Sequence, residues 1–154
     1  MKNKIETDVM DWNECQRNFI RNVEIDKERI KSIVKKAMQR LERARNTSVN
    51  LENVSFVVED YYETVKELLV AYLLKNGLRS KNLQCLISYF YKQNPRYERE
   101  AFLISQMSFF RNRLNYYGED IPMEFYQKNK DDFEEVVRII LRAIENEKKS
   151  ENKQ

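Results

Sequence analysis

The stretch VSFVVEDYYETVKELLVAYLLKNG, residues 54–77, decides the fold. Its apolar residues recur at the three- and four-residue spacing of an α-helix and form a broad apolar face, made by Val58, Tyr61, Tyr62, Val65, Leu68, Leu69, Tyr72 and Leu73. We therefore expect a central helix that begins between Asn53 and Ser55. It should end at Lys75-Asn76-Gly77, because glycine readily takes the left-handed conformation that closes a helix.

The same periodicity predicts helices along most of the chain. A short amphipathic helix is expected around Trp12, Cys15, Phe19 and Val23, and longer ones over about 26–44, 83–91, 97–117 and 122–144. Glycine and proline number only two each, which leaves few turns for strands. We predict an all-α protein, namely an up-down bundle of four helices with one or two extra short helices.

The predicted domain organisation is simple, because 154 residues fit one folded unit. Residues 1–24 would form an N-terminal extension, polar and loose up to about residue 11 and then helical. Residues 25–146 would form the helical bundle, and residues 147–154 a charged flexible tail.

Composition excludes several classes of function. The net charge of +3 is a small surplus of 28 basic over 25 acidic residues, unlike a dedicated nucleic-acid binder. The chain has no histidine, the usual general base and zinc ligand, so we expect neither a metal nor a cofactor. Cys15 and Cys85 lack a CxxC pattern and are expected to be reduced thiols. Without a signal-like or membrane-spanning apolar run, we expect a cytoplasmic protein with no membrane partner.

The strongest candidate site is residues 111–118, Arg-Asn-Arg-Leu-Asn-Tyr-Tyr-Gly, at the end of an apolar helix. Arginine matches phosphate geometry, amides donate hydrogen bonds and tyrosine rings stack on bases, so RNA or nucleotide binding is predicted for Arg111, Asn112, Arg113, Asn115 and Tyr116. The alternative is a helix end whose arginines pair with Glu119, Asp120 or Glu124 and whose tyrosines are half-buried. Arg111 and Tyr116 lie about 140° apart on a regular helix, so they converge on one ligand only from the flanks of a groove, across a symmetric interface or if the helix ends early.

Two other charged groups are interpreted as structural. Glu59, Asp60 and Glu63 lie in the first turns of the central helix, where carboxylates complement the helix dipole. The basic residues of the 26–44 helix would form either a phosphate-binding face or, as we prefer, a solvated surface; they are Lys31, Lys35, Lys36, Arg40 and Arg43.

Arg111-Asn112 followed by Tyr116 resembles the signature of the HEPN family, which has an arginine, a polar residue and a histidine four to six residues after the arginine. The segment 67–78 with its glycine, followed by residues 86–90, is similar to the second helix, glycine loop and third helix of HEPN proteins. The similarity covers roughly residues 28–146.

The resemblance implies a helical bundle that pairs as a homodimer, with the motif of each copy lining a shared cleft. Many HEPN proteins are metal-independent RNases acting as toxins or in phage defence. Others are partners of minimal nucleotidyltransferases, which silence them by modifying a tyrosine near the motif. In this family the arginine stabilises phosphoryl charge and the histidine transfers protons.

This sequence departs from the signature at the histidine position, which is Tyr116. Because tyrosine has a pKa of about 10, it is a poor general base at neutral pH. We therefore expect a homodimeric module that binds RNA or a nucleotide and is weakly active or inactive. One alternative is a metal-independent RNase that uses Arg111 and Tyr116, and another is a helical adaptor that binds a protein through Trp12 and Phe19.

Overall fold

The computed structural model describes the backbone of residues 10–152 and the side chains of residues 10–145. The predicted loose N-terminus therefore lies outside the described residues up to residue 9, and so do the last two residues of the predicted tail. Within the described part, the all-α prediction is confirmed. The helices are α2 (Trp12–Asn18), α3 (Lys27–Asn46), α4 (Val54–Lys75), α5 (Leu83–Gln93), α6 (Glu98–Tyr117) and α7 (Met123–Asn152), with a 3-10 turn at Pro95–Tyr97.

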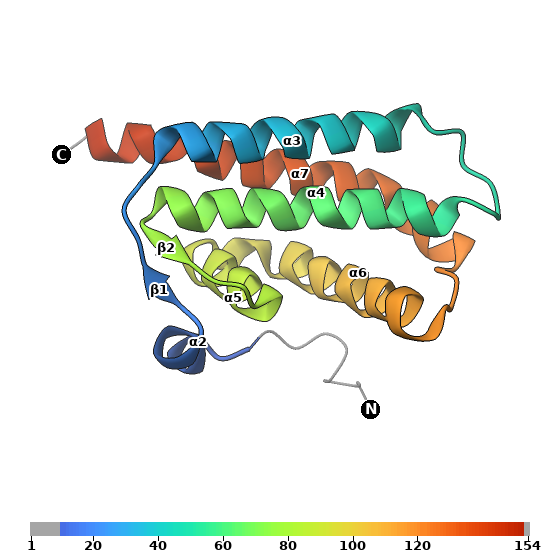
Figure 1. Cartoon of the computed structure of the whole chain (residues 1–154), viewed down its shortest axis with the longest axis horizontal. Helices are drawn as coiled ribbons and strands as arrows, with labels where there is room; N and C mark the ends of the chain where they lie inside the picture. Colours follow the sequence, from blue (N-terminus) through green and yellow to red (C-terminus); the bar gives the residue numbers. More distant parts are fainter. Residues whose placement is uncertain (1–9, 153–154) are drawn as a thin grey trace.

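The central position predicted for α4 is confirmed. This helix contacts α3, α5, α6 and α7, and Figure 1 shows it running between α3 on one side and the α5–α6 pair on the other. Val58, Val65, Leu68, Leu69 and Leu73 are fully buried along its length. Since α4 has a broad apolar face, with its charged residues gathered on the remaining side, it can serve as the common core of four neighbouring helices.

Gly77 ends α4 as predicted and also allows a close approach of the N-terminal segment. Its φ of +74° is in the left-handed region, and a Cβ at this position would lie 3.4 Å from the carbonyl oxygen of Val23. The Val23 amide donates a hydrogen bond of 2.9 Å to the carbonyl of Gly77. Next to this contact, strands β1 (Arg21–Asn22) and β2 (Leu78–Arg79) form a short antiparallel pair that the sequence did not predict.

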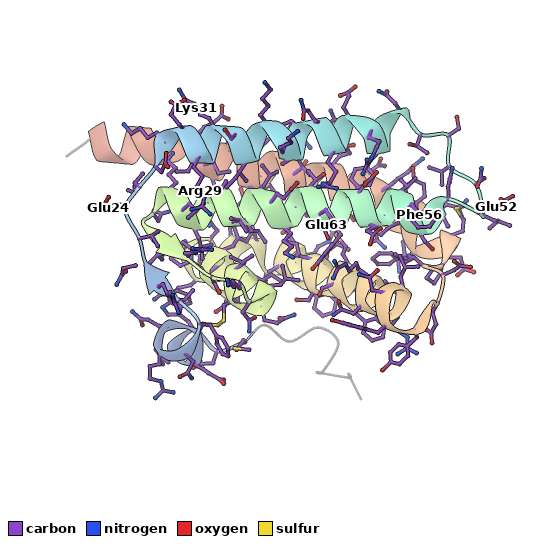
Figure 2. The ribbon with its side chains drawn as sticks, viewed as in Figure 1. Glu24, Arg29, Lys31, Glu52, Phe56 and Glu63 are labelled. Carbon is purple, nitrogen blue, oxygen red and sulfur yellow. A yellow bond between two sulfur atoms is a disulfide. The ribbon has the colours of Figure 1, made fainter. Side chains whose placement is uncertain are left out.

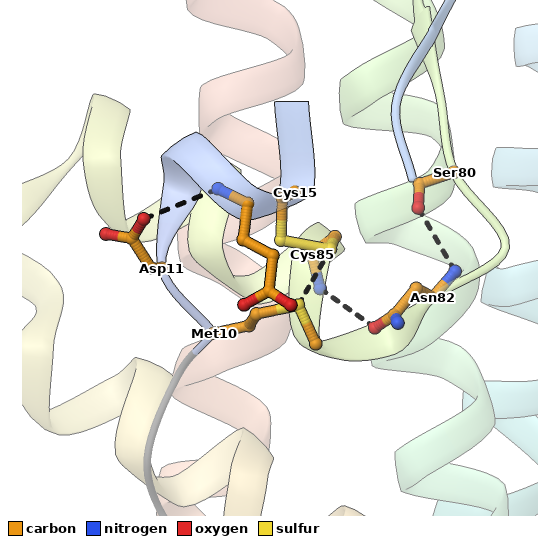
Figure 3. Close-up of a disulfide and its surroundings, with 7 residues drawn as sticks. Met10, Asp11, Cys15, Ser80, Asn82 and Cys85 are labelled. Atoms are coloured by element: carbon orange, nitrogen blue, oxygen red, sulfur yellow. Dashed lines mark hydrogen bonds between the residues drawn. A yellow bond between two sulfur atoms is a disulfide. The ribbon is translucent and has the colours of Figure 1, made fainter. Parts of the chain in front are cut away.

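The prediction of reduced cysteines is wrong, because Cys15 of α2 and Cys85 of α5 form a disulfide (Figure 3). Both residues are completely buried, although they are 70 positions apart in the sequence. Their pairing depends on α2 packing against the start of α5, which no local spacing of cysteines reveals. Trp12 adds a second contact, since its ring lies 5.3 Å from that of Tyr89 in α5. The N-terminal helix is thus attached to the other helices covalently and by packing.

Polar contacts between helices involve two arginines of the basic face of α3. Arg43 forms a two-point ion pair with Asp60 of α4, with its closest contact at 2.6 Å, and Arg40 donates to Glu67 at 3.1 Å. Lys31 pairs with Glu28 on its own helix. The structural interpretation of this face therefore accounts for both arginines.

Glu134 of α7 joins three helices. Its carboxylate accepts hydrogen bonds from the guanidinium of Arg45 on α3, at 2.6 Å, and from the hydroxyl of Tyr61 on α4, at 2.9 Å. The hydrogen bond from Arg45, with that from Tyr61, holds the pKa of Glu134 below its usual range. Burial and the hydrogen bond to Glu134 raise the pKa of Tyr61.

Replacing Glu134 by glutamine is expected to change the pH dependence of stability. A carboxyl group whose pKa is lower in the folded than in the unfolded state stabilises the fold above its unfolded pKa of about 4.3, and this contribution is lost as the pH falls through the folded pKa. We expect Glu134→Gln to cost about 1–2 kcal/mol at pH 7 and progressively less in acid. Urea unfolding at several pH values measures this, with exposed Glu124→Gln on the same helix as the control. Equal effects of the two substitutions on the free energy of unfolding at pH 7 would show that the Glu134 carboxylate does not stabilise the fold.

Candidate functional site at the end of α6

Helix α6 remains regular through the predicted site. It ends at Tyr117, and Gly118 closes it with a φ of +65° and a hydrogen bond from its amide to the carbonyl of Leu114. The end of the helix agrees with the predicted range of about 97–117. Because the helix does not end early, that route for bringing Arg111 and Tyr116 to one ligand is not available in this structure.

Arg111 faces α4 and lies between two of its carboxylates. Its Nη2 is 3.3 Å from Oε2 of Glu63, its Nε is 3.9 Å from Oε2 of Glu59, and the guanidinium lies 5.4 Å from the centre of the Tyr62 ring. Figure 2 labels Glu63, about midway along α4. These carboxylates, assigned from the sequence only to the helix dipole, are thus the partners of the central candidate residue.

The hydrogen-bonding capacity of Arg111 is only partly used within the described residues. Its Nε is buried without a hydrogen-bond partner, and the single hydrogen bond to Glu63 is long at 3.3 Å. A guanidinium has five N–H donors, and a quarter of this side chain remains exposed. Beneath it, burial raises the pKa of Tyr62, while the positive charge of Arg111 opposes this rise. The arrangement is a partly open cationic group on an uncharged aromatic ring.

Arg113 is held on the outer side of α6. Its Nε and Nη2 each donate at 2.6 Å to the two carboxylate oxygens of Glu119, and this ion pair lowers the pKa of Glu119. The guanidinium also lies 5.1 Å from the centre of the Tyr117 ring. The alternative prediction of pairing with Glu119, Asp120 or Glu124 therefore holds for Arg113, whereas Arg111 pairs with residues of α4 instead.

The other predicted site residues point into solvent. Tyr116 is 76% exposed and Tyr117 70%, and the amides of Asn112 and Asn115 are exposed as well. The alternative that these tyrosines are half-buried core is therefore wrong. Leu114, between them and Arg111, packs against the core as its helical position predicts. The structure thus places the guanidinium of Arg111 against α4, whereas the side chain of Tyr116 is largely exposed.

The start of α4 extends this exposed region with apolar side chains. Phe56 is 61% exposed and Leu51, in the preceding loop, 76%. Ser55 fixes this end of α4 to the α6–α7 connection, because its Oγ accepts a 2.8 Å hydrogen bond from the amide of Ile121. Phe56, labelled in Figure 2, precedes Glu59 by about one turn of α4, and Asn115 follows Arg111 by about one turn of α6. Because Arg111 contacts Glu59 and the two helices are antiparallel, Phe56 and Asn115 lie at the same height along the helices.

We call this region the end surface and define it by six exposed residues: Leu51, Phe56, Asn112, Asn115, Tyr116 and Tyr117. Phe56 and Leu51 were not predicted to belong to the site from the sequence. Their place beside α6 depends on the packing of α4 against α6, which local periodicity does not encode.

Among the described residues, no three histidine, cysteine or carboxylate side chains are grouped so that they could hold a metal ion. Likewise, no described helix combines the length and the apolar character needed to cross a membrane. Comparison of the chain with protein-family models, with curated proteins and with solved structures found no match in any of the three.

Proposed function

We propose that the protein is an HEPN-like helical bundle that binds single-stranded RNA or a nucleotide at the end surface. One observation carries the proposal: two tyrosine rings, 76% and 70% exposed, adjoin two exposed amides on the last turns of one helix. Exposed aromatic rings stack on bases of any sequence, and amides form hydrogen bonds to base edges or phosphate. Tyr116, Tyr117, Asn112 and Asn115 supply these groups without competing for core contacts.

Arg111 has a supporting role in this proposal. Apart from the buried Nε, its remaining N–H donors lie on a side chain that is one-quarter exposed and are available to a phosphate, but Glu59 and Glu63 cancel much of its charge. Arg113 is likewise neutralised by Glu119. We therefore assign most of the binding free energy to stacking and hydrogen bonding, and we expect a weaker dependence on salt than for a highly basic nucleic-acid binder.

The proposal includes pairing of two copies through the end surface. Arg111 and Tyr116 lie about 140° apart on a regular helix that does not end early, so they can contact one ligand from the flanks of a groove or across an interface between two copies. The proposed dimer uses the second of these routes. The exposed Phe56 and Leu51 provide apolar surface for such an interface. In this scheme a minimal nucleotidyltransferase is a further partner, and the exposed Tyr116 hydroxyl is accessible to it. The biological role of the protein is then regulation in a toxin–antitoxin or defence system.

Substitutions of Tyr116 test the stacking proposal. We expect Tyr116→Ala to weaken binding of a short single-stranded RNA by about tenfold, in line with the roughly 1–3 kcal/mol assigned to one base–ring stack. Tyr116→Phe keeps the ring and should bind almost as wild type. Fluorescence anisotropy of a labelled oligonucleotide measures both. Since the side chain is largely exposed, neither change should alter the melting temperature.

Three outcomes would count against the proposal. Absence of RNA and nucleotide binding by the wild-type chain would remove the function. Equal RNA affinities of Tyr116→Ala and wild type would show that the end surface is not the binding site. A strict monomer by analytical ultracentrifugation, with and without RNA, would remove the shared cleft.

A second candidate function, RNA cleavage, is favoured by the contact between Arg111 and Glu63. A carboxylate beside an arginine combines a proton acceptor with a group that stabilises phosphoryl charge. Glu63 would then take the proton that the sequence interpretation assigned to Tyr116, whose ring is on another side of the helix. Incubation of the same RNA in EDTA with wild type, Glu63→Gln and Tyr116→Phe distinguishes Glu63 from Tyr116 as the proton acceptor. Cleavage lost only with Glu63→Gln supports RNA cleavage through Glu63, and no cleavage by wild type excludes it.

A further inference from the structure

The junction between the N-terminal segment and α5 contains a basic cavity that the proposed function does not use. Its volume is about 440 Å³, within the range of roughly 300–1,000 Å³ for small-molecule sites. Its lining includes Asn18, Phe19, Arg21, Arg79, Ser80 and Lys81. Three of these side chains are cationic, and among the described residues no carboxylate lines the cavity.

Two of the cations are placed against each other by the backbone. In the antiparallel pair of β1 and β2, Arg21 is directly opposite Arg79. Residues directly opposite in such a pair project from the same face, and like charges there repel each other. Within the described residues, neither arginine forms an ion pair or a hydrogen bond with an acidic side chain. Glu24, labelled in Figure 2 just beyond β1, does not line the cavity. An anion between the two guanidiniums would remove this repulsion.

The remaining lining suits an organic ligand with a planar group. Phe19, at the C-cap of α2, is 40% exposed and lines the cavity. Ser80 accepts a hydrogen bond of 3.1 Å from the amide of Asn82, which leaves its hydroxyl proton for a ligand. Asn82 itself caps α5 by accepting from the Cys85 amide, so its carbonyl oxygen is already used. Figure 3 shows Ser80 and Asn82 next to the disulfide.

The disulfide fixes the two walls of the cavity relative to each other. Asn18 and Phe19 follow Cys15 by about one helical turn, and Lys81 and Asn82 precede Cys85 by a similar distance. A covalent bond between the walls lowers the entropic cost of binding, because the ligand does not have to order them.

We propose that this cavity binds a nucleoside monophosphate, with the phosphate between Arg21 and Arg79, near Lys81, and the base against Phe19. Arginine forks match phosphate oxygens, and an aromatic ring stacks on a base. The site is separate from the end surface, since the two lie at opposite ends of α4, about 30 Å apart for a helix of 22 residues.

Isothermal titration of the full oxidised chain with AMP tests the proposal, with ribose 5-phosphate and adenosine as partial ligands. We expect AMP to bind more tightly than either one. Arg21→Ala and Arg79→Ala should each weaken AMP binding about tenfold or more, as expected for loss of a charge-assisted hydrogen bond. Phe19→Ala should lower the affinity for AMP to that for ribose 5-phosphate. All three side chains are exposed, so these variants should fold as wild type.

Arg17→Ala is the matched control, because it removes the same charge from the last turn of α2 but does not line the cavity. Its AMP affinity should equal that of wild type. Failure of AMP to bind, or equal losses in Arg17→Ala and Arg79→Ala, would overturn the proposal. Equal affinities for AMP and ribose 5-phosphate would overturn the assignment of the base to Phe19. AMP binding lost in Tyr116→Ala but kept in Arg79→Ala would place the nucleotide at the end surface instead.

Discussion

Removal of the disulfide between Cys15 and Cys85 is expected to lower the free energy of unfolding by about 4 kcal/mol. The bond closes a loop of 70 residues, and the chain-entropy relation for a loop of that size gives this value. Both cysteines are fully buried, so the double variant Cys15→Ala/Cys85→Ala also loses packing volume where α2 meets α5. Urea unfolding of the oxidised chain, the reduced chain and the double variant measures the effect.

The comparison among the three samples separates entropy from packing. The reduced wild type keeps both side chains and should lose the entropic part alone, whereas the double variant should lose slightly more. Trp12 gives a local probe, because its ring contacts Tyr89 and its fluorescence should change if α2 detaches from α5. A midpoint of unfolding that does not respond to reduction would show that the bond does not constrain the unfolded chain.

Phe133→Ala is expected to destabilise the protein by about 3–5 kcal/mol, the range for truncating a buried phenylalanine. Phe133 of α7 is completely buried, and its ring lies 5.4 Å from that of Tyr61 and 5.7 Å from that of Phe125. The loss would therefore leave a cavity between α4 and α7 and disturb two further aromatic contacts. Chemical denaturation monitored by circular dichroism gives the difference.

Phe56→Ala is the matched control for this change. It removes the same side chain from α4, but Phe56 is 61% exposed, so the expected effect on stability is within about 0.5 kcal/mol. Similar losses for the two variants would mean that Phe56 is covered in solution, as it would be in a dimer through the end surface. That result would be recognised by its dependence on protein concentration.

The helices could be predicted from the sequence because their signals are local. Apolar periodicity predicted the central place of α4 and the separate helices over about 83–91 and 97–117, and Gly77 and Gly118 lie at two helix ends. Such signals involve residues within a few turns of each other. The helix predicted around Trp12, Cys15, Phe19 and Val23 is too long, because α2 ends at Asn18. Arg21 and Asn22 form β1, and the amide of Val23, directly after this strand, donates a hydrogen bond to the carbonyl of Gly77.

Contacts between distant segments could not be predicted in the same way. The pairing of β1 with β2 involves two residues in each strand, too few to produce an alternating pattern, and the disulfide joins positions with no motif around them. The contacts of the site could not be predicted for the same reason. Arg111 was correctly predicted to lie in a helix over about 97–117, but its contact with Glu63 depends on how α6 is aligned along α4.

The covalent topology created by the disulfide has one more consequence. Residues 15–85 form a closed ring that contains α3, α4 and the loop between them, while α6 and α7 continue from it as a tail. A single cut by a protease in the loop at residues 47–53 would open the ring without releasing a fragment. The nicked molecule would keep α3, α4 and the end surface in one covalent piece, and it would separate into two only in the presence of a reductant.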